Sequence, residues 1–223
     1  MKKNKKQFPL GLIVVALIAG LMLSFTTVQG ARAALNEKSD DYDTTITMKK
    51  IDVEIVIEND DILANVPEDY IPGEEYETSV KVKNTGEIAE YVRVVVYRYW
   101  TDSNGNKDTS LDPEMIVLGL GGDGWVLDKD AHTAERDILY YSKPLESGEE
   151  KSETSSVISS VKVDTEVMNK VTITEKDGVI TKTYAYNDKN FVVEIEVDSI
   201  QEHNYVDAAK SAWGVNINSK IGG

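Results

Sequence analysis

From residue 51 onward, apolar and polar side chains alternate with a period of two along much of the chain. Ile51, Val53, Ile55 and Ile57 occupy every second position of one run, and the same period returns at 80–83. Such alternation is typical of a β-strand with one buried face. The strongest instance is 90–100, where valines at 92, 94 and 96 share one face and the other carries Tyr91, Arg93, Val95, Tyr97 and Tyr99.

Shorter apolar runs predict further strands. They lie at 115–118, 125–127, 138–141 and 155–163, followed by a final group at 170–174, 179–186 and 191–197. Asp177-Gly178 between two β-branched runs predicts a hairpin, because a primed turn needs positive φ. About nine or ten strands at this spacing predict an all-β fold, a two-sheet sandwich of jelly-roll or immunoglobulin-like type.

One short helix is predicted near the C-terminal end of the sequence. Asn204 can cap it, Asp207 follows three residues later, and Gly214 ends it. The residues that fall on one face of this helix are Tyr205, Ala209, Ala212 and Trp213. We expect residues 44–223 to form a single β-sandwich domain that carries this helix.

The first 33 residues have the pattern of a secretory signal peptide. Four lysines lie within the first six residues, an apolar run follows at 10–25, and Ala31-Arg32-Ala33 supplies small residues for cleavage after Ala33. The alternative is an uncleaved anchor, but a run of roughly 16 residues is short of the roughly 20 that span a bilayer. Residues 34–43 are polar and acidic, which predicts a flexible leader.

Charge and cysteine content narrow the function classes. Five of the 24 basic residues and none of the 39 acidic ones lie in 1–33, so the remaining chain has 39 acids against 19 bases, a formal charge of −20. Such a surface repels nucleic acids and anionic lipids, so we expect neither a nucleic-acid partner nor membrane contact after signal cleavage. The absence of cysteine excludes disulfides, thiolate metal sites, a cysteine nucleophile and a lipoprotein anchor.

One loop has alternating oxygen ligands, as calcium loops do. Asp102, Asn104, Asn106 and Asp108 would be the ligands. An EF-hand would need Gly at the sixth and Glu at the twelfth position, where this chain has Lys107 and Pro113. A hairpin turn at Asn104-Gly105 explains the same residues. Calcium is the one cofactor that the sequence suggests.

Catalytic motifs are missing from the sequence. Residues 119–124 (GLGGDG) match G-x-G-x-x-G, but strand-like Trp125-Val126-Leu127 follows where a dinucleotide site needs a helix. His132 and His203 are the only histidines, and neither lies in H-E-x-x-H. We therefore expect no enzymatic activity and no catalytic residues.

Aromatic residues gather in the strand at 90–100. Tyr91, Tyr97 and Tyr99, together with Trp100, can form a face on which a carbohydrate stacks. The alternative is that this stripe forms half of the sandwich core or a sheet interface. The sequence leaves both interpretations open.

Several motif blocks resemble the TasA/camelysin group of exported biofilm-matrix and surface proteins of Gram-positive bacteria. The blocks are Pro72-Gly73-Glu74, Val80 to Gly86 (VKVKNTG), Tyr91 to Val94 (YVRV), Gly124-Trp125, Tyr140 to Leu145 with Gly148-Glu149, and Ser199-Ile200-Gln201 before Ala212-Trp213. The resemblance implies a jelly-roll subunit that builds extracellular fibres. Some members are called metallopeptidases, an activity that we do not carry over because no zinc motif is present.

We therefore expect a secreted structural subunit of an extracellular matrix or surface filament, a homopolymer with other matrix components as further partners. Its N-terminal residues Thr44, Thr45, Ile46, Thr47 and Met48 are the predicted donor strand, with Ile46 and Met48 filling a groove of the next subunit. The alternative for 44–49 is the first strand of the chain's own sheet. Alternatives for the protein are a monomeric adhesin or carbohydrate-binding module and an exported metallopeptidase.

Overall fold

The computed structural model describes residues 49–57, 71–148, 152–176 and 179–222. The signal peptide predicted at 1–33, the leader at 34–43 and the donor strand Thr44, Thr45, Ile46, Thr47 and Met48 lie outside these ranges. The described residues all belong to one unit of the chain, 47–223. None of its described helices is long and apolar enough to span a membrane.

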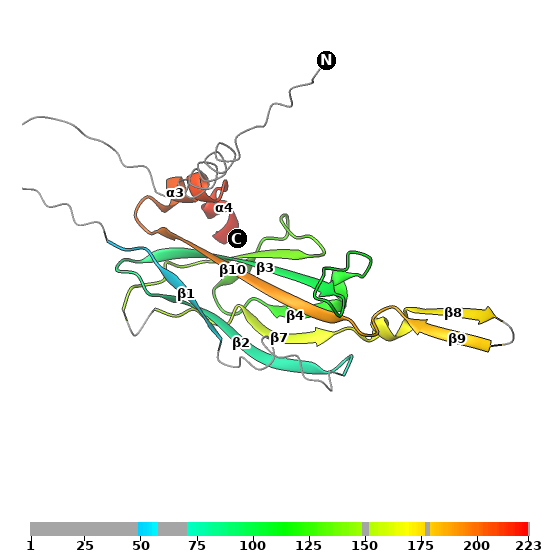
Figure 1. The fold of residues 1–223 in the computed structure, drawn as a ribbon. Helices are drawn as coiled ribbons and strands as arrows, with labels where there is room; N and C mark the ends of the chain where they lie inside the picture. Colours follow the sequence, from blue (N-terminus) through cyan, green and yellow to red (C-terminus); the bar gives the residue numbers. More distant parts are fainter. Residues whose placement is uncertain (1–48, 58–70, 149–151, 177–178, 223) are drawn as a thin grey trace, which may run out of the picture. The chain divides into compact units, whose positions relative to one another are not determined.

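Two four-stranded antiparallel sheets form the body of this unit (Figure 1). The first has the order β1-β2-β7-β4 and contains β1 (Val53–Ile57), β2 (Glu75–Asn84), β7 (Ile158–Val163) and β4 (Ile116–Leu120). The second has the order β10-β3-β6-β5 and contains β10 (Asn190–Gln201), β3 (Glu90–Thr101), β6 (Arg136–Tyr141) and β5 (Trp125–Leu127). Short 3₁₀ turns at Pro113–Met115 (η1) and Thr165–Asn169 (η2) connect strands.

The alternating residues of facing strands make the core between the sheets. Val92, Val94 and Val96 on β3 face Val80 and Val82 on β2, and all five are at most 1% exposed. The same cluster includes the fully buried Ile116, Leu139, Ile158 and Val161. Burial of aliphatic side chains from both inner faces is the main source of stability of such a sandwich.

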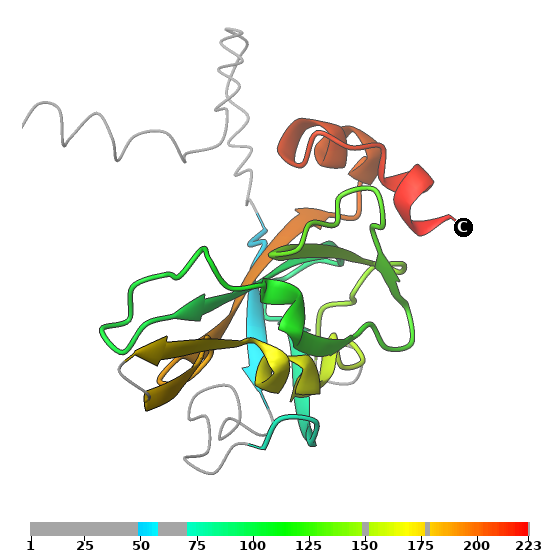
Figure 2. The ribbon, with the colours of Figure 1, turned by 90° about the vertical axis from the view of Figure 1, so that its right-hand side faces the viewer.

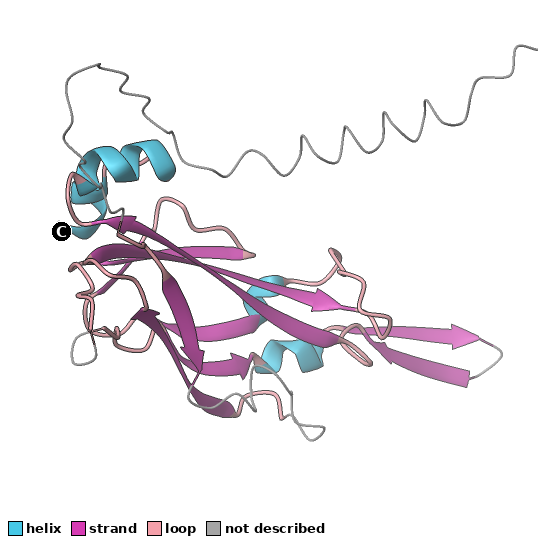
Figure 3. Cartoon of the chain, turned by 60° about the vertical axis from the view of Figure 1, so that its left-hand side comes forward, coloured by secondary structure: helices cyan, strands magenta, loops and turns pink. Residues whose placement is uncertain are grey.

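Two short helices and a hairpin lie outside the sandwich. Helices α3 (Tyr205–Ala212) and α4 (Ile217–Ile221) follow β10, and they are cyan in Figure 3. Strands β8 (Val171–Lys176) and β9 (Val179–Tyr184) form a separate two-stranded sheet, which points toward the viewer in Figure 2. We call this hairpin the arm.

The predicted fold class is confirmed: the described residues are mostly β, in antiparallel sheets that fit a sandwich. The C-terminal helix is also confirmed, but a second one, α4, follows it. Asn204 precedes α3 in a left-handed conformation (φ 55°), and its side chain makes no capping hydrogen bond. The glycine run 119–124 ends β4 and turns into β5, where Gly124 has φ 84° and packs on the ring of Tyr141. It is therefore a strand connection.

Candidate functional site

One long side of the sandwich is open. Strands β4 and β5 form the last strands of the two sheets on this side, and a hollow of about 460 Å³ lies between them. Its apolar lining consists of Leu118 and Leu120 from β4 and Leu127 from β5; its polar lining consists of Arg98, Lys129, His132 and Asp137. Among the described strands, β4 pairs only with β7, so one of its edges has no neighbour. We call this region the open side.

Leu127 shows most directly that the core is incomplete there. It lies on the same face of β5 as Trp125, which is 8% exposed and donates a hydrogen bond from Nε1 to the carbonyl of Ser155 (2.9 Å). Leu127 pairs with Leu139 of β6, which is fully buried, yet Leu127 itself is 36% exposed. Leu127 therefore lies on the core face of β5 but stays partly exposed, and with Leu118 and Leu120 it forms the apolar lining of the hollow.

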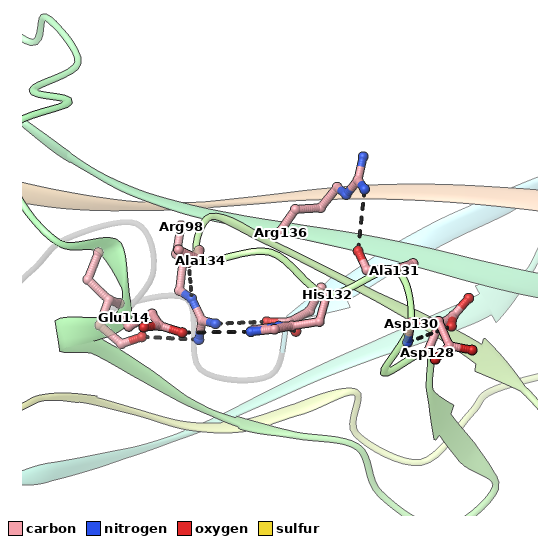
Figure 4. A network of polar contacts seen from close by, with 10 residues as sticks. Arg98, Glu114, Asp128, Asp130, Ala131, His132, Ala134 and Arg136 are labelled. Carbon is pink, nitrogen blue, oxygen red and sulfur yellow. Dashed lines mark hydrogen bonds and ion pairs between the residues drawn. The ribbon is translucent and has the colours of Figure 1, made fainter.

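A charged network occupies the core at this side (Figure 4). Arg98 follows Val92, Val94 and Val96 at the same period, so its side chain points inward, where it pairs with Asp137 of β6 at 3.1 Å. The two side chains are only 10% and 3% exposed. Arg98 also donates to the carbonyls of Ala134 (3.1 Å) and Ile116 (3.3 Å). Because Ile116 belongs to β4, this guanidinium links the two sheets.

His132 extends the network toward solvent. Its Nδ1 lies 2.7 Å from Oδ1 of Asp137, and its Nε2 lies 3.7 Å from Oε1 of Glu114. Both ring nitrogens therefore face carboxylates, which position the imidazole. Within the described part of the chain, no three His, Cys, Asp or Glu side chains are grouped to hold a metal ion. The absence of enzymatic activity stays a prediction.

Sequence reasoning missed this network, although one signal was present. An arginine at the fourth position of a valine-lined face must bury its charge or leave the core, and a buried guanidinium needs an acidic partner. The partner, Asp137, occupies the equivalent inward position on β6. The strand period therefore predicts a buried pair at Arg98, but only the pairing of β3 with β6 identifies its partner.

The predicted calcium ligands lie in the loop after β3. Oδ1 of Asp102 accepts hydrogen bonds from the amides of Asn104 and Asn106, both at 2.9 Å, and the Asn106 bond lowers the pKa of Asp102. The Asp108 carboxylate instead accepts from Nζ of Lys189 at 2.8 Å, which lowers the pKa of Asp108 to about 2. The structure thus brings Asp102, Asn104 and Asn106 into one turn and directs Asp108 to Lys189. Calcium binding stays a prediction.

The aromatic stripe divides into three environments. Tyr97 and Tyr99 line a hollow of about 380 Å³ on the outer face of β3, where Nζ of Lys107 lies 5.1 Å from the centroid of the Tyr99 ring. Trp100 points into the core, and Tyr91 stacks on Tyr205 of α3 with ring centroids 4.5 Å apart. Of the two interpretations that the sequence leaves open, a joint face of these tyrosines with Trp100 is not formed, because residues 99 and 100 point to opposite faces of the strand.

Comparisons with known proteins identify no related family or sequence. No family model matches the chain, and no curated protein matches its sequence.

Proposed function

We propose that this chain is an exported, non-enzymatic subunit that polymerises into extracellular matrix or surface filaments by strand addition. Residues 44–48 of one copy would occupy the open side of the next copy. The observation that carries the proposal is the exposed, core-facing Leu127 beside the edge of β4 that no described strand pairs with. The motif blocks that resemble the TasA/camelysin group support the same function.

The chemistry of the predicted donor fits this groove. In the sequence TTITM, Ile46 and Met48 fall on one face of an extended strand, and β-branched threonines favour that conformation. Main-chain hydrogen bonds to this edge of β4 would hold the strand in place. Burial of the two apolar side chains against Leu118, Leu120 and Leu127 would contribute about 1.5–3 kcal/mol each.

Strand addition of this kind leads to an open polymer. The donor and the groove are different surfaces, so each copy can give one strand and receive another without closing a ring. The formal charge of −20 after residue 33 opposes association, so salt should promote it by screening. Filaments should therefore form more readily at high ionic strength.

Electron microscopy of the exported chain tests the proposal. Deletion of 34–49 should leave a folded monomer that forms no filaments, and Leu127→Asp should do the same by placing a charge in the groove. Val126→Asp is the matched control, because residue 126 points to the outer face of the same strand. Filaments of normal length from the deletion variant would refute strand addition.

The donor side has an equivalent pair of variants. Ile46→Asp should block polymerisation, whereas Thr47→Asp, one residue along on the opposite face, should not. Equal loss in both variants would mean that the segment acts through its charge and not through its apolar face.

Export is a separate part of the proposal. We expect the secreted protein to begin at Ala34, because the small residues of 31–33 suit a signal peptidase. N-terminal sequencing of protein from the culture medium measures this. Secreted or surface protein that still contains residues 10–25 would mean that the segment serves as an anchor.

A monomeric adhesin is the second candidate, and the hollow beside Tyr97 and Tyr99 is the observation in its favour. Glycan-array binding that is lost in Tyr97→Ala, in a chain that forms no filaments, would favour the adhesin.

A further inference from the structure

The arm presents an apolar face that the rest of the described chain leaves exposed. All twelve described residues of β8 and β9 are exposed. Their register places Val171 beside Tyr184, Ile173 beside Lys182 and Glu175 beside Ile180 on one face. The four large apolar residues of this face, Val171, Ile173, Ile180 and Tyr184, are 37–63% exposed. The opposite face carries mainly threonines, at 172, 174, 181 and 183.

Such a hairpin is not a stable unit by itself. A two-stranded sheet is marginal in water unless its apolar face packs on another surface, and grouped exposed apolar side chains mark interaction sites. The arm also differs in charge from the rest of the chain. Residues 170–184 have three lysines against two acids, in a chain whose formal charge is −15. The apolar face itself carries one base, Lys182, and one acid, Glu175, so it is neutral and can approach an acidic surface that repels the rest of the chain.

A surface of that kind lies at the other end of the same unit. A hollow of about 520 Å³ beside α3 is lined by Tyr91, Tyr205, Val206, Glu202 and Asp207, together with His203 and Asn204. Strand β10 begins six residues after the arm and ends four residues before α3, and its twelve residues span roughly 40 Å. Figures 1 and 3 both show the arm and α3 at opposite ends. One chain therefore cannot bring its own arm to its own hollow.

We propose that the arm of one copy docks, apolar face first, on the α3 hollow of a second copy. Val171, Ile173, Ile180 and Tyr184 would cover Tyr205 and Val206, and Lys182 would approach Glu202 and Asp207. The contact rests on the proposed function, since it joins copies head to tail as strand addition does. It names a second contact at the junction between neighbouring subunits.

The positions of the two contacts are compatible with one junction. Val53, where β1 begins, pairs with Asn84, and Glu202 donates its amide hydrogen to the carbonyl of Ala89, so the chain enters the sandwich at the α3 end. At the other end, Ile116 pairs with Val163, just before η2 and the arm. A donor segment that leaves at the α3 end of one copy therefore reaches the open side of a neighbour from the end where that neighbour's arm projects.

The small size of the arm limits the affinity of the contact. One face of a hairpin with two six-residue strands is well below the roughly 800 Å² per partner of a stable stand-alone interface. The arm should therefore bind weakly between free copies and strongly only where strand addition already holds two copies together. Tethering of this kind raises the effective concentration of the second contact.

Engineered disulfides test the docking, because the natural chain has no cysteine. In the exported chain that carries Ile173→Cys and Val206→Cys, we expect oxidation of assembled protein to give a ladder of covalent oligomers. Mass spectrometry should identify the peptide pair that contains positions 173 and 206. The matched control carries Thr172→Cys and Val206→Cys; residue 172 points to the other face of β8, and its 172–206 pair should be lost.

Each outcome decides one of the two proposals. Filaments that form without the 173–206 cross-link, or with equal cross-linking of 172 and 206, overturn arm docking and leave strand addition intact. A selective 173–206 cross-link in a chain that forms no filaments supports arm docking between copies and overturns the filament function.

Discussion

Both long sides of the sandwich are built from antiparallel strands, but the core between the sheets is completed on one side and left open on the other. On one side β1 packs against β10, and the inward residues of both strands, such as Ile55 and Ile195, join the central core. On the other side β4 and β5 leave a hollow, and Leu127 remains exposed although it faces inward. Strand length accounts for much of the difference. Strand β10 pairs with β3 along twelve residues, whereas β5 pairs with β6 along three.

The two sides also differ in how the core is completed. Aliphatic residues complete it at β1 and β10, and the Arg98–Asp137 pair occupies the corresponding place at the open side. A buried ion pair contributes little net stability, since desolvation offsets the attraction between its charges, but it is costly to break. Polar contacts therefore hold the open side in shape, while Leu127 stays partly exposed.

The largest effect should come from breaking that pair. Asp137→Ala leaves the Arg98 guanidinium buried without its carboxylate and should destabilise the fold by about 3–5 kcal/mol in urea unfolding. Asp198→Ala is the control, because the Arg93–Asp198 pair lies on the outer face with Asp198 45% exposed, and it should cost less than about 1 kcal/mol. Equal effects in the two variants would mean that the open side is no better ordered than the surface.

A smaller difference in stability should distinguish the alanine variants of two leucines that are cross-strand partners. Leu139→Ala removes a fully buried side chain and should cost about 2–5 kcal/mol. Leu127→Ala should cost about 1 kcal/mol or less, because its side chain is already partly in water. Urea unfolding measures both, in dilute, low-salt solution, where repulsion between acidic copies should disfavour association. A large cost at Leu127 would show that the open side is already covered in the monomer.

On the side where β1 packs against β10, replacing a buried carboxylate should raise the stability of the fold instead of lowering it. Glu90 is fully buried and accepts from the amide of Asp52 at 3.0 Å, just before β1, and burial raises the pKa of Glu90. Since the folded pKa lies above the unfolded one, stability falls as the pH rises through these values. Glu90→Gln keeps the hydrogen-bond acceptor, so it should unfold at a higher temperature than the natural protein at pH 7. The difference should disappear in acid; a gain that persisted there would point to another cause.

The smallest effect should come from the Asp108–Lys189 pair at the start of β10. The Lys189 ammonium holds the pKa of Asp108 at about 2, below the usual 3.8. A carboxyl with a lowered pKa contributes stability above pH 3.8, and this contribution is lost as the pH falls toward 2. In Lys189→Met, NMR titration should find the pKa of Asp108 closer to 3.8. An unchanged pKa would assign the shift to Ser110, which also donates to this carboxylate.

Much of the sandwich is predictable from the period of two. The valines of β3, the antiparallel pairing of β8 with β9, and helix α3 all follow from local pattern. The open side does not follow from local pattern, because it depends on which strands become neighbours in space and on where each of them ends. Leu127 has the same local sequence signal as a buried core residue, and only the short β5 ladder leaves it exposed. The arm was predicted as a hairpin, but its separation from both sheets is a tertiary property that local pattern does not contain.

The long ladder between β3 and β10 has a mechanical consequence. Its hydrogen bonds run across the strands, and β10 joins the arm end of the unit to the α3 end. A force that pulls these two ends apart along the strands loads the inter-strand hydrogen bonds in shear, so the bonds share the tension and must break together. If the arm hairpin were pulled open from its two strand ends, its inter-strand hydrogen bonds would instead break one at a time. A fibre built through the two ends of β10 would accordingly resist stretching while its junctions yield first.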